Sequence, residues 1–339
     1  MHCRLLVPDL LSPASPAMRR PPAGLAALLK FGRAETMVGD ANAWLCRAFG
    51  VERQQDIPLA PYALLGVGGT PGSDYWLCAD PVTVQLMRNR LVLLAGSETA
   101  PSAEETEQFV AALNQHFSPE GLHFSAPHPQ RWYLRLPATP AMHTHPLAEV
   151  HGRDIRHFLP EGGDSAHWRK LLNEAQMLLH AHPLNAAREA AGAFPINSVW
   201  LWGGGTLSHK LSAEYDRLYA NDPLARGLAI AAGIPYLPLP EKFPESTELA
   251  GNAPLFVTEH LGDTMRQGVG RDAALERLDR DWLTPAIAAV RRGNIQRLTL
   301  IAAGETASVT VTLTRPDLWK FWRRGTTTLK QLTEMTGDT

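Results

Sequence analysis

The sequence predicts an α/β protein built around a mostly parallel sheet. Three observations carry this prediction: short apolar runs have the length of buried strands, helical segments separate them, and polar or glycine-rich turns follow them. Such alternation is typical of a sheet that helices cover on both faces. We expect four apolar runs in this sheet, at residues 5–7, 197–202, 254–257 and 298–301.

The composition limits the class of protein. The 339 residues are 45% hydrophobic and 19% charged, which is enough for a large core, and the net charge of −2 argues against a nucleic-acid-binding protein. Three widely spaced cysteines indicate no disulfide framework and fit a reducing compartment. We find no apolar leader at the start and no apolar run of about 20 residues. We therefore expect a cytoplasmic protein with neither a membrane nor a nucleic acid as its partner.

The stretch 171–205 is the most informative part of the chain. Its apolar residues predict a helix that stops before Pro183, and Asn185 has the residue type of an N-cap for the next short helix. The buried strand at 197–202 then runs into a glycine turn.

Arg188 and the glycine turn predict a ligand site. In open α/β sheets, ligands bind at the carboxyl ends of strands, and glycines there let backbone N–H groups approach an anion. A guanidinium binds carboxylate or phosphate in a bidentate manner. We therefore expect an anion pocket formed by Asn185, Arg188, Gly203, Gly204 and Gly205, with a helix–strand core unit as the alternative.

This stretch carries a resemblance to a known family. The run HPLNAAREAAGAFPINSVWLWGGG resembles the H-P-x-N-x-x-R…P-x-N signature of archaeal-type, cofactor-independent phosphoglycerate mutases, and also the RpfE-type regulatory proteins. The mutases belong to the alkaline-phosphatase-like superfamily, so the resemblance implies a three-layer sandwich with a small inserted α+β subdomain. It places the core at 1–80 and 160–325, the insert at 81–159 and a flexible tail at 326–339.

The resemblance also implies a nucleophile and metal ligands. The run Pro71-Gly72-Ser73-Asp74 is similar to the mutase loop that presents a phosphoryl-accepting serine, so Ser73 is the candidate nucleophile. Asp9, Asp74 and Asp263 are the candidate metal ligands. The alternative is that Asp9 caps a turn and that Ser73 and Asp74 cap a helix over 75–77.

The pattern departs from the mutases at two places. Gln267 stands where the D-x-x-x-H motif beginning at Asp263 has its histidine, and Ala303-Gly304 stands where an Asp-His pair belongs. Two adjacent divalent ions need several charged ligands to offset their repulsion and desolvation. The resemblance therefore implies a vestigial or weak metal site.

The middle of the chain is expected to form the insert. Two strand-like runs, 82–86 and 90–94, predict a hairpin, and 102–117 predicts a helix that opens with a capping box. His143 and His145 are of the residue types that bind metal, but exposed loop histidines are the alternative.

Three functions follow from these residues. The leading one is a degenerate, non-catalytic regulatory protein that binds a small phosphorylated or carboxylate ligand without a cofactor. The alternative is an active phosphoglycerate mutase or phosphohydrolase with rearranged ligands for manganese or magnesium. A third is a protein-interaction module that uses the aromatic and basic segment 319–324.

Overall fold

The computed structural model describes residues 1–11, 21–96, 99–208, 211–245, 251–258, 261 and 270–319. The chain forms two compact units. Unit 1 consists of Met1–Gly50 with Lys210–Thr339, and unit 2 is Val51–His209. Within the described ranges, no helix is long and apolar enough to cross a bilayer.

Unit 1 contains a seven-stranded sheet in the order β2-β12-β11-β1-β10-β8-β9. The strands from β11 to β9 run parallel, and β12 pairs antiparallel with both of its neighbours, β11 and β2. Its strands are β1 (His2–Val7), β2 (Arg33–Val38), β8 (Arg217–Tyr219), β9 (Tyr236–Leu237), β10 (Pro254–Val257), β11 (Arg297–Ala303) and β12 (Ala307–Thr314). Its helices are α1 (Ala23–Phe31), α2 (Ala41–Ala48), α8 (Pro223–Ala232), α10 (Arg271–Leu278) and α11 (Thr284–Arg292).

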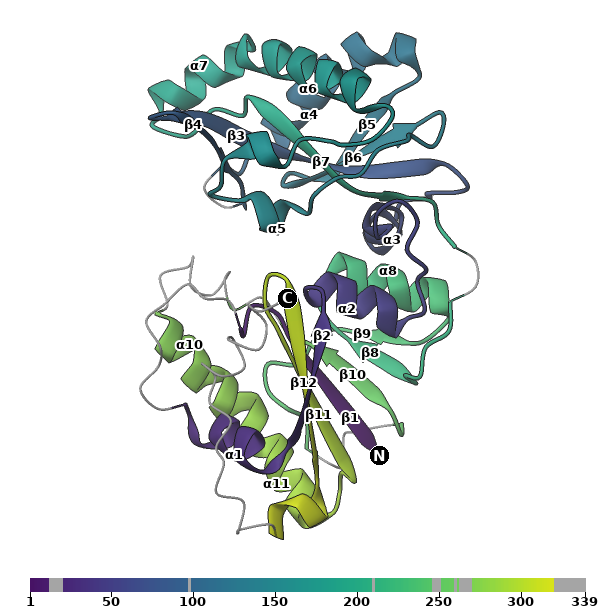
Figure 1. Cartoon of the computed structure of the whole chain (residues 1–339), viewed down its shortest axis with the longest axis vertical. Coiled ribbons are helices and arrows are strands. Elements are labelled where there is room, and N and C mark those ends of the chain that lie inside the picture. Colours follow the sequence, from purple (N-terminus) through teal and green to yellow (C-terminus); the bar gives the residue numbers. More distant parts are fainter. Residues whose placement is uncertain are drawn as a thin grey trace. The chain divides into compact units, whose positions relative to one another are not determined.

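Helices cover both faces of this sheet. α1, α10 and α11 lie on one face and α2 and α8 on the other (Figure 1). Alternate residues of β1 are buried with the first group of helices, since successive strand side chains point to opposite faces. The expected α/β sandwich with a mostly parallel central sheet is therefore confirmed.

A π-helical turn, Asp279–Leu283, joins α10 to α11 and anchors α1. Helix α1 follows Pro22, which supplies no side-chain cap. The buried carboxylate of Asp279 accepts instead from the backbone N–H groups of Gly24 and Leu25 at 3.1 and 2.7 Å. It thereby satisfies donors that a helix start leaves without intrahelical partners.

Unit 2 contains a sheet in the order β4-β3-β6-β5, with β7 paired to β3. Helices α4 and α6 contribute to the core beside it. Its strands are β3 (Tyr75–Met87), β4 (Arg90–Leu94), β5 (His123–His128), β6 (Arg131–Leu136) and β7 (Ser198–Gly205). Its helices are α3 (Leu59–Gly66), α4 (Ala103–Phe117), α5 (Leu147–Val150), α6 (Ser165–His180) and α7 (Pro183–Ala190).

The position of β7 corrects one expectation. The run 197–202 is a strand, but it pairs antiparallel with β3 and lies outside the parallel sheet that contains the other three runs. Every residue of β7 is buried. A strand that is apolar on both faces fits the interior of either sheet, so its composition does not select the partner.

The boundaries of unit 2 also differ from the insert expected at 81–159. The unit begins at Val51 and ends at His209, because β3 needs β7 as its neighbour and α6 packs on the same core. The parallel sheet therefore resumes after β7, later than the expected position near residue 160. The expected tail, 326–339, lies outside the described residues.

Candidate functional site

The carboxyl edge of the parallel sheet in unit 1 is where a ligand site is expected in such folds. β1 ends at Val7, and Asp9 follows with a left-handed φ of 61°. This conformation is uncommon outside glycine, although aspartate tolerates it better than most residues. The chain then turns so that the backbone N–H of Leu11 donates to Ala303 O at 3.0 Å.

The charged neighbour of Asp9 is an arginine from α10. The Arg271 guanidinium donates from Nη2 to the carbonyl oxygen of Leu10 at 3.0 Å. Burial lowers the pKa of Arg271, and the carboxylates of Asp9 and Asp272 oppose that shift. A half-buried arginine is thus near enough to interact electrostatically with the carboxylate that the resemblance assigns to a metal.

The end of β11 is filled by packing. Ala303 is fully buried, and Gly304 donates its N–H to Ala307 O at 2.9 Å. A Cβ added to Gly304 would lie 3.2 Å from both Leu11 Cβ and Ala307 O, which is tighter than ordinary contact. A larger side chain at Gly304 would therefore press on Leu11, and one at the fully buried Ala303 would also have to displace its neighbours.

The two candidate metal ligands that the structure describes each have a cationic neighbour. Asp74 pairs with Arg135 at 3.6 Å, and Asp9 lies near Arg271. Among the residues that the structure describes, no group of three or more His, Cys, Asp or Glu side chains could hold a metal ion. Asp263 and Gln267 fall outside these residues.

Ser73 lies in an exposed turn, and the helix expected after it is a strand. β3 begins at Tyr75, because the run Tyr75–Cys78 is apolar and aromatic and pairs with β6. Ser73 therefore has no helix N-terminus behind it to stabilise a developing anion. The activation that the resemblance implied for this serine is not provided by the local fold.

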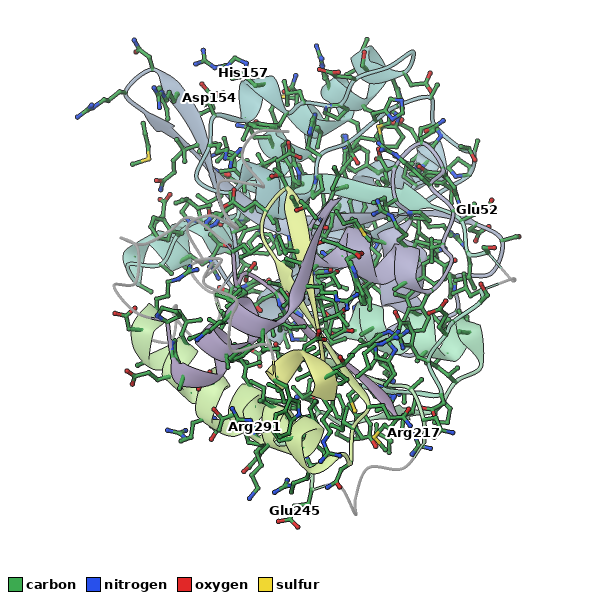
Figure 2. The ribbon with its side chains drawn as sticks, turned by 60° about the horizontal axis from the view of Figure 1, so that its bottom comes forward. Glu52, Asp154, His157, Arg217, Glu245 and Arg291 are labelled. Carbon is green, nitrogen blue, oxygen red and sulfur yellow. The ribbon has the colours of Figure 1, made fainter. Side chains whose placement is uncertain are left out.

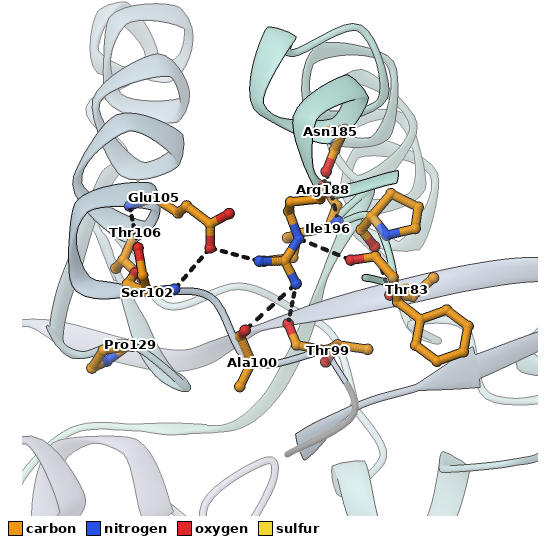
Figure 3. A network of polar contacts seen from close by, with 12 residues as sticks. Thr83, Thr99, Ala100, Ser102, Glu105, Thr106, Pro129, Asn185, Arg188 and Ile196 are labelled. Carbon is orange, nitrogen blue, oxygen red and sulfur yellow. Dashed lines mark hydrogen bonds and ion pairs between the residues drawn. The ribbon is translucent and has the colours of Figure 1, made fainter. Parts of the chain in front are cut away.

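Arg188 is held by structural contacts and is not directed at an anion site. Figure 3 shows its guanidinium between α4 and α7, where Nη1 lies 2.6 Å from Glu105 Oε2. Nε donates to Phe194 O at 2.9 Å, and Nη2 donates to Thr99 O at 3.2 Å. The side chain is 6% exposed. These contacts argue against an anion-binding role for Arg188, because internal acceptors occupy its guanidinium.

The three glycines make separate close contacts. A Cβ at Gly203 would meet Leu59, one at Gly204 would meet Leu77 and Tyr75, and one at Gly205 would meet Pro58. Gly203 has a φ of 63°. The glycines allow β7 to approach β3 and the start of α3 closely, and they share no contact partner with Arg188.

The remaining polar residues of this block connect backbone segments. His182, and not Asn185, caps α7, since its side chain accepts from Leu184 N. Asn185 donates to Leu179 O and Ile196 O and accepts from Ile196 N. Asn197 exchanges two bonds with the backbone of Val84. The distinctive spacing of the block thus encodes side-chain-to-backbone bonds that fix α6, α7 and β7.

The two candidate metal-binding histidines have different partners. His143 Nδ1 lies 3.0 Å from Gln55 O, and His145 Nδ1 lies 3.3 Å from Glu149 Oε2. They therefore do not form the chelating pair that their spacing permits.

A pocket of about 210 Å³ lies in unit 1 at the carboxyl ends of β8, β9 and β10. Leu261, Leu278 and Trp282 provide apolar walls, and the polar lining includes Thr258, Arg277 and the carboxylates of Glu241 and Asp281. Arg277 is 68% exposed and lies 3.8 Å from the carboxylate of Asp281. No single stretch of the sequence indicates this pocket, because its residues come from four separate segments.

The architecture has a counterpart among solved structures. The PH0037 protein from Pyrococcus horikoshii matches with a TM-score of 0.53 and 11% identity, over 92% of this chain and 87% of that one. At this identity the likeness shows the fold. No family model matches the chain.

The curated relatives carry one name. The 2,3-bisphosphoglycerate-independent phosphoglycerate mutase of Methanosarcina mazei is 27% identical over 140 residues, which are 39% of this chain and 35% of the relative. The probable enzyme of that name from Geobacter sulfurreducens is 30% identical over 94 residues, or 26% and 24%. The matches span about a quarter to a third of these relatives. They support the likeness to phosphoglycerate mutases.

Proposed function

We propose that this chain is a degenerate relative of the cofactor-independent phosphoglycerate mutases with a regulatory, ligand-binding role. The observation that carries the proposal is the packing of Leu11 against Ala303 and Gly304. Where the resemblance implies an Asp-His pair, the chain has a fully buried alanine and a glycine without room for a larger side chain. The likeness to RpfE-type regulatory proteins is part of the same proposal.

Three further observations support it. Ser73 precedes a strand, Arg271 lies beside Asp9, and Arg188 is engaged internally. A serine hydroxyl is a weak nucleophile without a base, a metal or a helix N-terminus to activate it. The ligand would be a small molecule with a phosphate or carboxylate group.

A mutase assay with manganese or magnesium, paired with calorimetric titration of each metal, tests the proposal. We expect neither turnover nor tight metal binding, because loss of the metals removes the charge neutralisation that phosphoryl transfer requires. Ser73→Ala is the matched variant and should behave like the parent protein.

The alternative is an active phosphotransferase or phosphohydrolase that binds manganese or magnesium through rearranged ligands. Asp9 at the end of β1 and the names of the relatives favour it. Turnover that requires a metal and disappears in Ser73→Ala would establish this alternative and overturn the proposal.

A further inference from the structure

The β3–β4 hairpin ends in a tip that is apolar and basic at the same time. Here the hairpin tip means residues 85–92, Gln85-Leu86-Met87-Arg88-Asn89-Arg90-Leu91-Val92, which contain no acidic residue. Leu86 is 72% exposed and Met87 is 53% exposed. Arg88 and Arg90 are exposed as well.

The apolar side chains lie on both faces of the hairpin. Leu86 pairs with Leu91 across the two strands, so these two share one face. Met87 pairs with Arg90 and Gln85 with Val92, which places Met87 and Val92 on the other face. A flat protein partner would cover one of these faces, whereas a bilayer interface takes up both.

The tip is held in a fixed conformation. The Arg156 guanidinium donates from Nη2 to Asn89 O at 2.8 Å and pairs with Asp154 at 2.5 Å. The backbone of Asp154 forms an isolated antiparallel β-bridge with Val92, so Asp154 lies beside the hairpin (Figure 2). Arg156 and Asp154 neutralise each other, and Arg88 and Arg90 add exposed positive charge at the tip.

We propose that the hairpin tip docks onto an anionic phospholipid surface, with Leu86 and Met87 entering the interface and the arginines binding headgroup phosphates. Burial of large apolar side chains and attraction of basic residues to acidic lipids are the two components of peripheral membrane binding. A fixed turn carries a small ordering cost on docking. The proposal is independent of the regulatory role proposed above.

Co-sedimentation of the full chain with vesicles tests the proposal. We expect binding to vesicles of phosphatidylcholine mixed equally with phosphatidylglycerol, and little binding to phosphatidylcholine alone. The double variant Leu86→Ser with Met87→Ser should bind about a hundredfold more weakly, since each buried leucine or methionine contributes about tenfold or more. Arg88→Gln with Arg90→Gln should lose about fivefold per arginine, and the loss should shrink at high salt.

Matched controls come from elsewhere on the chain. Met177→Ser removes a methionine that is 66% exposed on α6, and Arg291→Gln removes an exposed arginine at the end of α11. Both should bind like the parent. Unchanged circular dichroism will show that the tip variants fold.

A fluorescent probe at the turn gives a second measurement. The three native cysteines are buried, and burial raises their thiol pKa, so Asn89→Cys would carry the reactive thiol for an environment-sensitive dye. We expect a blue shift on addition of the anionic vesicles. Failure of the full chain to bind these vesicles, or equal binding by the tip variants, would overturn the proposal. Binding to polyglutamate without binding to vesicles would also overturn it and would indicate an acidic protein partner.

Discussion

At the scale of single residues, Gly304 decides what the end of β11 can hold. Its missing side chain lets Leu11 pack against the strand end. We expect Gly304→Ala to lower the free energy of unfolding by about 1–3 kcal/mol, because a new methyl group meets atoms that cannot all move away.

Urea denaturation measures this change, with Gly163→Ala as the matched control. The nearest atom to a Cβ at Gly163 is 3.6 Å away, so this variant should change stability by less than about 0.5 kcal/mol. Equal stability of both variants would mean that the strand end has room for a side chain, which would contradict the close packing of Leu11 against Gly304.

His2 makes the stability of the fold depend on pH. Burial, followed by the charges of Arg4, Arg297 and the N-terminus, lowers the pKa of His2 from 6.5 to about 4. The unfolded chain therefore binds a proton more readily than the folded one. The stabilisation from neutral His2 is complete above about pH 6.5 and decreases as the pH falls toward about 4.

His2→Gln removes this titration and retains a polar partner for Thr299, which lies 2.9 Å from His2 Nε2. We expect the urea midpoint of the parent to fall more steeply than that of the variant between about pH 7 and pH 4. Parallel pH profiles would show that His2 is protonated equally in both states.

At the scale of elements, Arg188 connects α7 to α4 through Glu105. Glu105 also accepts from the backbone N–H of Ser102, so one carboxylate serves the capping box and the ion pair (Figure 3). Breaking such a pair leaves a charge without its partner. We expect Arg188→Met to lower the free energy of unfolding by about 2–4 kcal/mol.

Thermal and urea unfolding measure this loss, with Arg291→Met as a control that should cost less than about 0.5 kcal/mol. Phosphate and phosphoglycerate should stabilise the parent and Arg188→Met to the same extent. A ligand-dependent stabilisation that only Arg188 supports would restore the anion pocket.

The sequence predicts elements better than it predicts their partners. The 82–86 and 90–94 hairpin and the capped helix α4 are confirmed, because adjacent residues determine both. The choice of β3 as the neighbour of β7 is a long-range choice that the apolar run does not reveal. β2 was missed because it is a sheet edge with exposed polar residues and lacks a buried face.

The candidate site shows the same limit. The sequence predicted that Arg188 and Asn185 bind a ligand, whereas in the structure their partners include internal backbone and side-chain groups. Arg271 gave no signal, since an arginine at a helix start is ordinary until the fold brings Asp9 close to it. The spacing of a motif shows which residues matter. Whether such a residue binds a ligand or holds the fold together depends on contacts with residues distant in sequence.

At the scale of the whole molecule, unit 2 has its own sheet and its own core. We expect a recombinant fragment of residues 51–209 to fold cooperatively by itself. The fragment 81–159, which is the insert expected from the sequence, should not fold, because it lacks β7 and α6. Far-ultraviolet circular dichroism with thermal melts compares the two, and a folded 81–159 fragment would contradict the observed division.

The pairing of β1 with β10 and β11 has a consequence for how the chain is made. β1 leaves the ribosome well before its neighbours, which are Leu255–Val257 and Arg297–Ala302. At about 5–20 residues per second, β1 waits on the order of tens of seconds for its partners. Unit 2 can complete its sheet in that interval, since β3 to β7 are translated without interruption. The nascent chain therefore carries a folded unit 2 while β1 is still unpaired and needs protection from aggregation.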